Sequence, residues 1–252
     1  MIKQQIFRVG QIVPSSNTTM ETEVPAMLRR ITNSDLDFSF HSSRAPMKTV
    51  SKDELTAMNQ HMTRCAVELS DARMDVIASA CLVAIMCQGN GYHRETERAI
   101  ANAAHASAPQ TSIITSAGAL ISGLKALGAK RVAMITPYMT DLTDLVVGYI
   151  EHEGIEVLDA VSLEIPDNLA VGARDPLALV EISKNVKLGN ADALIVSACV
   201  QMPSLAAIPE VQARLDIPVL STAVATTFEI LRALNLPTKV PDAGALLSGA
   251  YS

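Results

Sequence analysis

The sequence predicts an α/β fold of two pseudo-symmetric open lobes, each a mostly parallel four-stranded sheet flanked by helices. Three observations support this prediction. Short runs rich in Val, Ile and Leu alternate with longer amphipathic stretches, the same series of motifs occurs twice, and 49% of the 252 residues are hydrophobic. Strands that alternate with helices indicate parallel crossover units, whose sheets are covered on both faces. The expected active site is the cleft between the lobes.

Eight apolar runs are expected as strands, in the order 6–13, 36–41, 76–80, 112–115, 132–136, 155–160, 193–197 and 219–221. Helix starts lie between them, because Thr18 and Ser51 are each followed three residues later by a glutamate, as in a capping box. We expect residues 1–115 and 222–252 to form the first lobe and residues 116–221 to form the second.

The internal repeat links corresponding strands of the two lobes. Three pairs of segments match in the same order along the chain, namely 8–15 with 131–138, 75–83 with 192–200, and 115–117 with 221–223. Apolar strands can resemble one another by chance, but three pairs in one order are difficult to obtain in that way. Because ligands bind at the carboxyl ends of strands in open α/β sheets, the residues directly after these strands are candidates for a site.

Composition and charge exclude several functions. With a net charge of −6, 3% aromatic residues and no Trp, the chain lacks the features of a nucleic-acid binder. The longest apolar run, 76–87, is too short to span a membrane, and the N-terminus lacks the pattern of a secretory signal. We therefore expect a cytoplasmic protein. The four cysteines form no CxxC pair, the histidines are scattered, and no phosphate-binding motif is present, so no metal or cofactor is expected.

Two cysteines occupy matching places in the repeat. Cys81 and Cys199 each follow an apolar strand, after an alanine. If a helix begins there, its N-terminus is expected to lower the pKa of the thiol. The plain alternative is that both are ordinary core cysteines, which are common. Cys65 and Cys87 have no such symmetry and are interpreted as core residues. Two thiols across a cleft suit acid, base or nucleophile chemistry next to a carboxylate.

Polar residues near these positions could bind a carboxylate. Ser15 and Asn17 follow the first strand at an expected helix start, Tyr138 occupies the corresponding turn in the second half, and Asn168 follows the sixth strand. Each also has an ordinary structural interpretation as a cap, a turn residue or a packed ring. Arg44 could also pair with a carboxylate, but a solvated side chain is the simpler interpretation.

Five longer segments carry a resemblance to a known family: 10–23, 80–86, 164–171, 197–204 and 244–251. Over essentially the whole chain, the sequence resembles the maleate cis-trans isomerases of the aspartate/glutamate racemase superfamily, which also contains the arylmalonate decarboxylases. The resemblance implies a pseudo-symmetric α/β fold, a homodimer and conversion of maleate to fumarate without a cofactor. It also implies a role in the bacterial degradation of nicotinate and related aromatics. Both cysteines are present, whereas the decarboxylases keep only the second-half cysteine.

Carried over by position, Cys81 resembles the family's nucleophile and Cys199 its assisting cysteine. The residues expected to bind the substrate are Asn17, Tyr138, Asn168, Ser15, Val83 and Val200. Addition of the Cys81 thiolate to the alkene would make the double bond single and allow rotation, after which expulsion of the thiolate would release fumarate. Cys199 would receive the Cys81 proton or protonate the carbanion.

Two other functions stay open at the level of sequence. A two-cysteine amino-acid or hydantoin racemase would use the same thiols as opposed acid and base, and solvent deuterium would enter the α-carbon of its substrate. Isomerisation by direct addition and elimination needs no such exchange. A small-dicarboxylate binding protein would bind maleate without turnover and would be indifferent to thiol alkylation.

Overall fold

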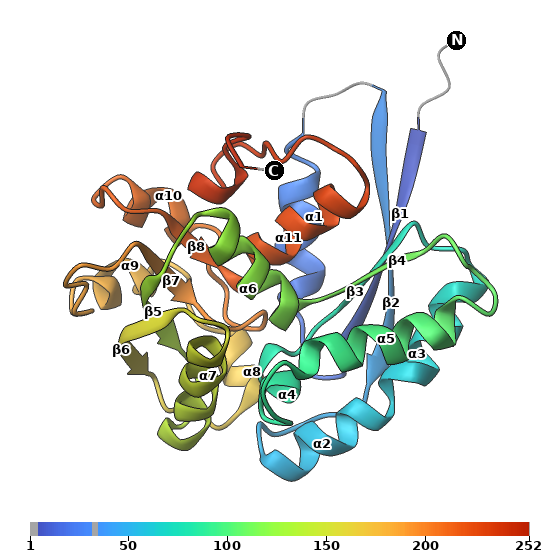
Figure 1. The fold of residues 1–252 in the computed structure, drawn as a ribbon, viewed down its shortest axis with the longest axis horizontal. Helices are drawn as coiled ribbons and strands as arrows, with labels where there is room; N and C mark the ends of the chain where they lie inside the picture. Colours follow the sequence, from blue (N-terminus) through green and yellow to red (C-terminus); the bar gives the residue numbers. More distant parts are fainter. Residues whose placement is uncertain (1–4, 32–34, 252) are drawn as a thin grey trace.

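The computed structural model describes residues 5–31 and 35–251, which form two parallel sheets with helices around them (Figure 1). This confirms the predicted α/β fold class. Residues 1–4, 32–34 and 252, which the sequence assigned to the first lobe, lie outside the described residues. No helix in the described ranges is both long and apolar enough to cross a membrane.

The first sheet has the strand order β2-β1-β3-β4, and all its pairs are parallel. Its strands are β1 (Gln5–Pro14), β2 (Leu36–Ala45), β3 (Val76–Ser79) and β4 (Ser112–Thr115). The helices of this part of the chain are α1 (Met20–Leu28), α2 (Lys52–Gln60), α3 (Met62–Asp71), α4 (Leu82–Met86) and α5 (Tyr92–Ala104). All four residues of β3 are buried, as expected for a strand covered on both faces.

The second sheet repeats this order as β6-β5-β7-β8, again with parallel pairs. Its strands are β5 (Arg131–Thr136), β6 (Glu156–Ser162), β7 (Ala193–Ser197) and β8 (Val219–Ser221). The remaining helices are α6 (Ser116–Ala126), α7 (Thr140–His152), α8 (Asn168–Gly172), α9 (Ala178–Ser183), α10 (Ala207–Gln212), α11 (Thr222–Ala233) and the 3-10 turn η1 (Ala245–Leu247). The sequence repeat thus corresponds to two sheets of one topology.

Two local predictions needed correction. The expected second strand ended at residue 41, but β2 continues to Ala45 because Ser42, Ser43 and Arg44 pair in register with β1. The capping box expected from Thr18 does not form. Instead, the Asn17 side chain accepts the backbone N–H of Met20 at 3.0 Å. Half of the other expected capping box forms, since Ser51 accepts the backbone N–H of Glu54, whereas the Glu54 carboxylate accepts the N–H groups of Lys48 and Thr49.

Contacts between the two halves come from helices as well as loops. Helix α11 follows β8 but packs against α6 and α1, and these helices lie together near the centre of the molecule (Figure 1). From α1, the buried Glu23 carboxylate accepts the backbone N–H groups of Ser204 and Leu205, both at 2.6 Å. Burial raises the pKa of this carboxyl despite those bonds. The lobe boundaries at residues 115 and 222 stay a prediction.

Candidate active site

A cavity lies where the carboxyl ends of strands from both sheets meet. It is narrow and is lined by residues from both halves of the chain. Seven of the eight residues expected at the site line it: Asn17, Cys81, Val83, Tyr138, Asn168, Cys199 and Val200. The lining is completed by Pro14, Met47, Val50, Leu82 and Gln201. None of these side chains is charged, so a bound anion would meet only dipoles, hydroxyl groups and thiols.

Cys81 lies on the sharp turn between β3 and α4. Its φ is 81°, in the left-handed region that favours glycine, which costs a cysteine about 1–3 kcal/mol. The turn is held by Ala80, whose N–H donates to the Ile12 carbonyl at 2.7 Å. This conformation places the thiol at the start of α4, near the N–H groups of Ala84 and Val83.

The prediction that the pKa of Cys81 is lowered is wrong, because the net change is a rise. Burial raises the pKa of the thiol to about 12, and the nearby Cys199 adds to the rise. The N–H groups of Ala84 and Val83 do lower the pKa, as the sequence predicted, but by less than burial raises it. The thiol is therefore protonated at neutral pH in this state of the cavity.

Cys199 lies in a loop, not at the helix start that its place in the repeat predicted. The chain after β7 stays irregular until a turn before α10, so no helix begins directly after this thiol. Its Sγ instead accepts the backbone N–H of Gln201 at 3.3 Å. Burial raises the pKa of Cys199, while the Tyr138 hydroxyl and the N–H groups of Gln201 and Met202 oppose that rise.

Tyr138 lies beside both thiols. Its hydroxyl donates to the Ala198 carbonyl at 3.1 Å, one residue before Cys199. Burial raises the pKa of Tyr138 well above its ordinary value, and the neighbouring thiols Cys199 and Cys81 add to this. The phenol therefore keeps its proton and can act as a hydrogen-bond donor.

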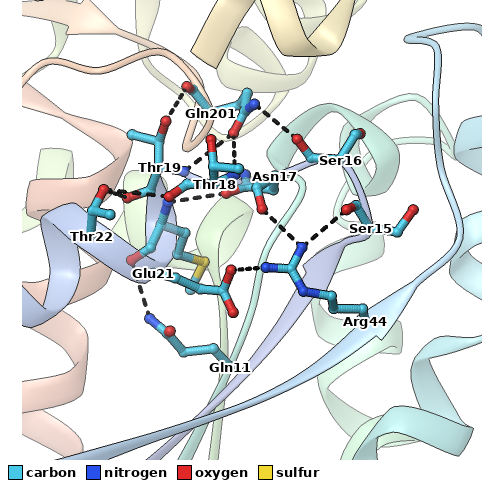
Figure 2. A network of polar contacts seen from close by, with 11 residues as sticks. Gln11, Ser15, Ser16, Asn17, Thr18, Thr19, Glu21, Thr22, Arg44 and Gln201 are labelled. Atoms are coloured by element: carbon cyan, nitrogen blue, oxygen red, sulfur yellow. Dashed lines mark hydrogen bonds and ion pairs between the residues drawn. The ribbon is translucent and has the colours of Figure 1, made fainter. Parts of the chain in front are cut away.

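Asn17 presents a buried donor without a partner. The residue is 1% exposed, its Oδ1 caps α1, and its Nδ2 is an unpaired buried polar atom (Figure 2). An unsatisfied buried donor costs about 1–3 kcal/mol, so its presence in a cavity wall points to a ligand acceptor. A carboxylate oxygen in the cavity would satisfy it.

Asn168 and Ser15 have different surroundings. The Asn168 Nδ2 already donates to the Ser16 hydroxyl at 2.8 Å, which joins α8 to the loop after β1. Ser15 is exposed and does not line the cavity. Its hydroxyl donates to the Met47 carbonyl and accepts the Met47 N–H, because the chain after β2 passes beside it. Ser15 thus positions a wall residue and does not face the cavity.

Arg44, which the sequence offered as a possible partner of a substrate carboxylate, binds other groups of the protein. Its guanidinium donates to the carbonyls of Ser15 and Asn17 and pairs with Glu21 (Figure 2). It therefore braces the loop after β1 from outside.

The other two cysteines lie apart from this cavity lining. Cys65 is fully buried, as expected for a core residue, and Cys87 is half-buried. In the described part of the chain, no three His, Cys, Asp or Glu side chains are grouped so that they could hold a metal ion.

The sequence interpretation missed Gln201, Met47 and Val50. Met47 and Val50 follow β2, so the rule that sites form at the carboxyl ends of strands could have identified them. An isolated backbone bridge between Thr49 and Asp167 brings this segment against the residue before α8. Gln201 follows Cys199 by two residues and has no counterpart in the first lobe, so the repeat gave no signal for it.

Comparisons with known proteins agree over nearly the whole chain. The family model described as arylmalonate decarboxylase matches residues 9–247. A maleate isomerase of Geobacillus stearothermophilus is 57% identical over 247 residues, which cover 97% of this chain and 98% of the relative. Two solved structures are also similar. One is a cysteine-to-alanine variant of a maleate isomerase from Pseudomonas putida S16 with maleate, at 57% identity and a TM-score of 0.96, covering 98% of this chain and 99% of that one.

The second similar structure is a cysteine-to-serine mutant of the Nocardia farcinica maleate cis-trans isomerase with a covalently bound succinylcysteine intermediate. It is 46% identical, covers 97% of this chain and 99% of its own, and has a TM-score of 0.93. Both the sheets and the turns that carry the cavity therefore have counterparts in solved structures.

Proposed function

This chain is an enzyme of the family of maleate isomerases and arylmalonate decarboxylases, and we propose that it converts maleate to fumarate without a cofactor. One observation carries the proposal: two thiols from matching places in the repeat, Cys81 and Cys199, line one uncharged cavity beside an unpaired amide donor. The relative with a succinylcysteine intermediate supports a covalent cysteine step.

Cys81 is the proposed nucleophile because its Sγ lies at the start of α4, where backbone N–H groups favour developing negative charge. Its sulfur forms a bond to one alkene carbon, and the π electron pair moves to the other carbon and its carboxylate. The C–C bond is then single and can rotate. Reversal of the addition expels the sulfur and leaves the trans isomer.

Hydrogen-bond donors around the cavity stabilise the charge that develops on the carboxylate. Asn17 offers its free Nδ2. The Tyr138 hydroxyl, which donates to the Ala198 carbonyl in this structure, would turn its proton toward the substrate carboxylate. A well-placed donor of this kind contributes roughly 3–4 kcal/mol to the transition state. Asn168 completes the proposed contacts, and Val83 and Val200 supply apolar walls next to the two thiols.

The addition also moves a proton, because burial raises the pKa of both thiols and so keeps them protonated. Cys199 donates its proton to the carbon that becomes negative and takes the proton that leaves Cys81. The net result is addition of S–H across the double bond to give a succinyl-cysteine. Elimination in the reverse sense restores both thiols.

The test is an ultraviolet assay of purified protein with maleate and a metal chelator, without added cofactor. Formation of fumarate is expected, and Cys81→Ser should abolish it, because a serine hydroxyl is a far weaker nucleophile. Cys87→Ser is the matched control, since Cys87 is half-buried and outside the cavity lining. Mass spectrometry should find a maleate-sized adduct on Cys81. Full activity of Cys81→Ser would refute the mechanism.

A homodimer, a cytoplasmic location and a role in nicotinate degradation, all expected from the sequence and its resemblance, stay predictions. Sedimentation of the purified protein tests the first of them.

A further inference from the structure

The side chain of Gln201 joins three segments that are far apart in the sequence. Its Nε2 donates to the Ser16 carbonyl at 3.1 Å and to the Asn168 carbonyl at 2.9 Å. Its Oε1 accepts the backbone N–H of Thr18 at 3.0 Å and that of Thr19 at 3.4 Å. The residue is 2% exposed, and its amide uses both hydrogens and both lone pairs. Figure 2 shows its contacts with Ser16, Thr18 and Thr19.

The backbone of Gln201 extends the same network. Its N–H donates to the Cys199 Sγ at 3.3 Å, and its carbonyl accepts the Thr19 hydroxyl at 2.7 Å. Gln201 therefore contacts the peptide groups on either side of Asn17, the backbone of Asn168 and the thiol of Cys199.

We propose that Gln201 is a positioning residue, which sets the separation of Asn17 and Asn168 and holds the Cys199 loop against them. The inference rests on the proposed function, because it assigns those three residues to substrate and proton transfer. Space for the amide is kept by Gly172, where a Cβ would collide with the Gln201 Nε2. A misplacement of about 1 Å at reacting groups lowers rates by about 100-fold, so a side chain that fixes their spacing controls turnover.

An amide suits this place because its neighbours are two carbonyls and two N–H groups. A glutamate of the same shape would keep the acceptor side but turn oxygen lone pairs toward the Ser16 and Asn168 carbonyls. When protonated, it would regain one donor. Burial disfavours the charged form of a carboxyl, so this protonated form should persist above the ordinary glutamate pKa.

The experiment compares Gln201→Met and Gln201→Glu with Gln212→Met in the isomerisation assay. Gln212 makes a similar set of bonds within the second lobe, to the carbonyls of Leu215 and Ile217 and the N–H of Val219, and does not line the cavity. We expect Gln201→Met to lower kcat by about 10- to 100-fold. Gln212→Met should leave kcat within about twofold of the parent, since it changes no contact of the reacting groups.

The pH profile separates positioning from a general loss of stability. For Gln201→Glu, the ratio of its kcat to that of the parent should fall as pH rises, because deprotonation removes the regained donor. For Gln201→Met the ratio should stay level with pH. An unchanged kcat in both variants, an equal loss in Gln212→Met, or a level ratio for Gln201→Glu would overturn the proposal. If Gln201→Met does not fold, the isosteric Gln201→Glu still provides the pH test.

If the parent protein does not turn over maleate, the proposed function is refuted but the positioning role of Gln201 is not. Thiol alkylation then tests that role. Peptide mapping after iodoacetamide treatment measures the rate at Cys199 directly. Release of its loop in Gln201→Met should raise that rate at least tenfold, while Gln212→Met should not change it. Equal rates in the two variants would overturn the positioning role.

Discussion

Asn17→Asp isolates the unpaired donor in the cavity wall. The aspartate keeps the oxygen that caps α1 through the Met20 N–H, so the local fold should be preserved. The free Nδ2 becomes an oxygen that faces the dicarboxylate. The lost hydrogen bond to a charged group is worth about 1.5–3 kcal/mol. Repulsion between unit charges about 4 Å apart adds about 4 kcal/mol at an effective dielectric constant of about 20. Because 1.4 kcal/mol is about tenfold, kcat/KM should fall by about 10⁴-fold.

The assay measures fumarate formation over a range of maleate concentrations, with thermal unfolding as the check on folding. Asn102→Asp is the control, because it makes the same change of charge on the exposed face of α5. It should leave kcat/KM unchanged. Activity of Asn17→Asp should recover partly at low pH, where the carboxyl is protonated and can donate. A kcat/KM within tenfold of the parent at neutral pH would refute the role given to Asn17.

Three further outcomes follow from the geometry. Alkylation of Cys81 by iodoacetamide should accelerate about tenfold per pH unit between pH 7 and 10 without a plateau, because burial raises the pKa to about 12; a plateau near pH 9 would contradict this. Tyr138→Phe should lower kcat by about 100- to 1,000-fold if its hydroxyl stabilises the developing charge, whereas a loss below tenfold would limit it to bracing Ala198. Glu23→Gln should flatten the dependence of stability on pH. Burial raises the pKa of Glu23, so the parent's free energy of unfolding falls as pH rises above about 4.5, which chemical denaturation at several pH values measures.

Much of the fold could be predicted because parallel strands buried on both faces leave a plain signal. The fully buried β3 and β7 are nearly continuous apolar runs, and the prediction for 193–197 agrees with β7 without change. At the edge of the first sheet, the apolar pattern does not predict where the strand ends. The end of β2 contains Ser42, Ser43 and Arg44, whose polarity suggests a loop, yet pairing with β1 keeps them in the strand. Backbone hydrogen bonds across a sheet decide such positions, and local composition does not reveal them.

The internal sequence repeat predicted those site residues that follow matching strands in the two lobes. Matching strand ends identified Cys81 and Cys199, and the structure brings both into one cavity. The repeat also suggested equal surroundings for the two thiols, but only Cys81 precedes a helix. The sign of the pKa change at Cys81 depends on burial between the lobes, a long-range property that spacing along the chain cannot report. Gln201 was missed for the same reason. Its hydrogen-bond partners in the loop after β1 lie more than 180 positions away in the sequence.

The uncharged cavity lining and the raised pKa values of the thiols have complementary electrostatic effects on a bound dianion. A resting thiolate at Cys81 would meet a dianion without a cation to offset it, and the repulsion would oppose binding by several kcal/mol at the separations of a small cavity. In the proposed mechanism, burial keeps the thiol neutral, so charge would form only as the C–S bond forms and would then move onto the substrate. The fixed dipoles of α4, Asn17 and Tyr138 would therefore interact more strongly with the proposed transition state than with bound maleate. Such a difference raises kcat, whereas a cation in the wall would stabilise ground state and transition state alike.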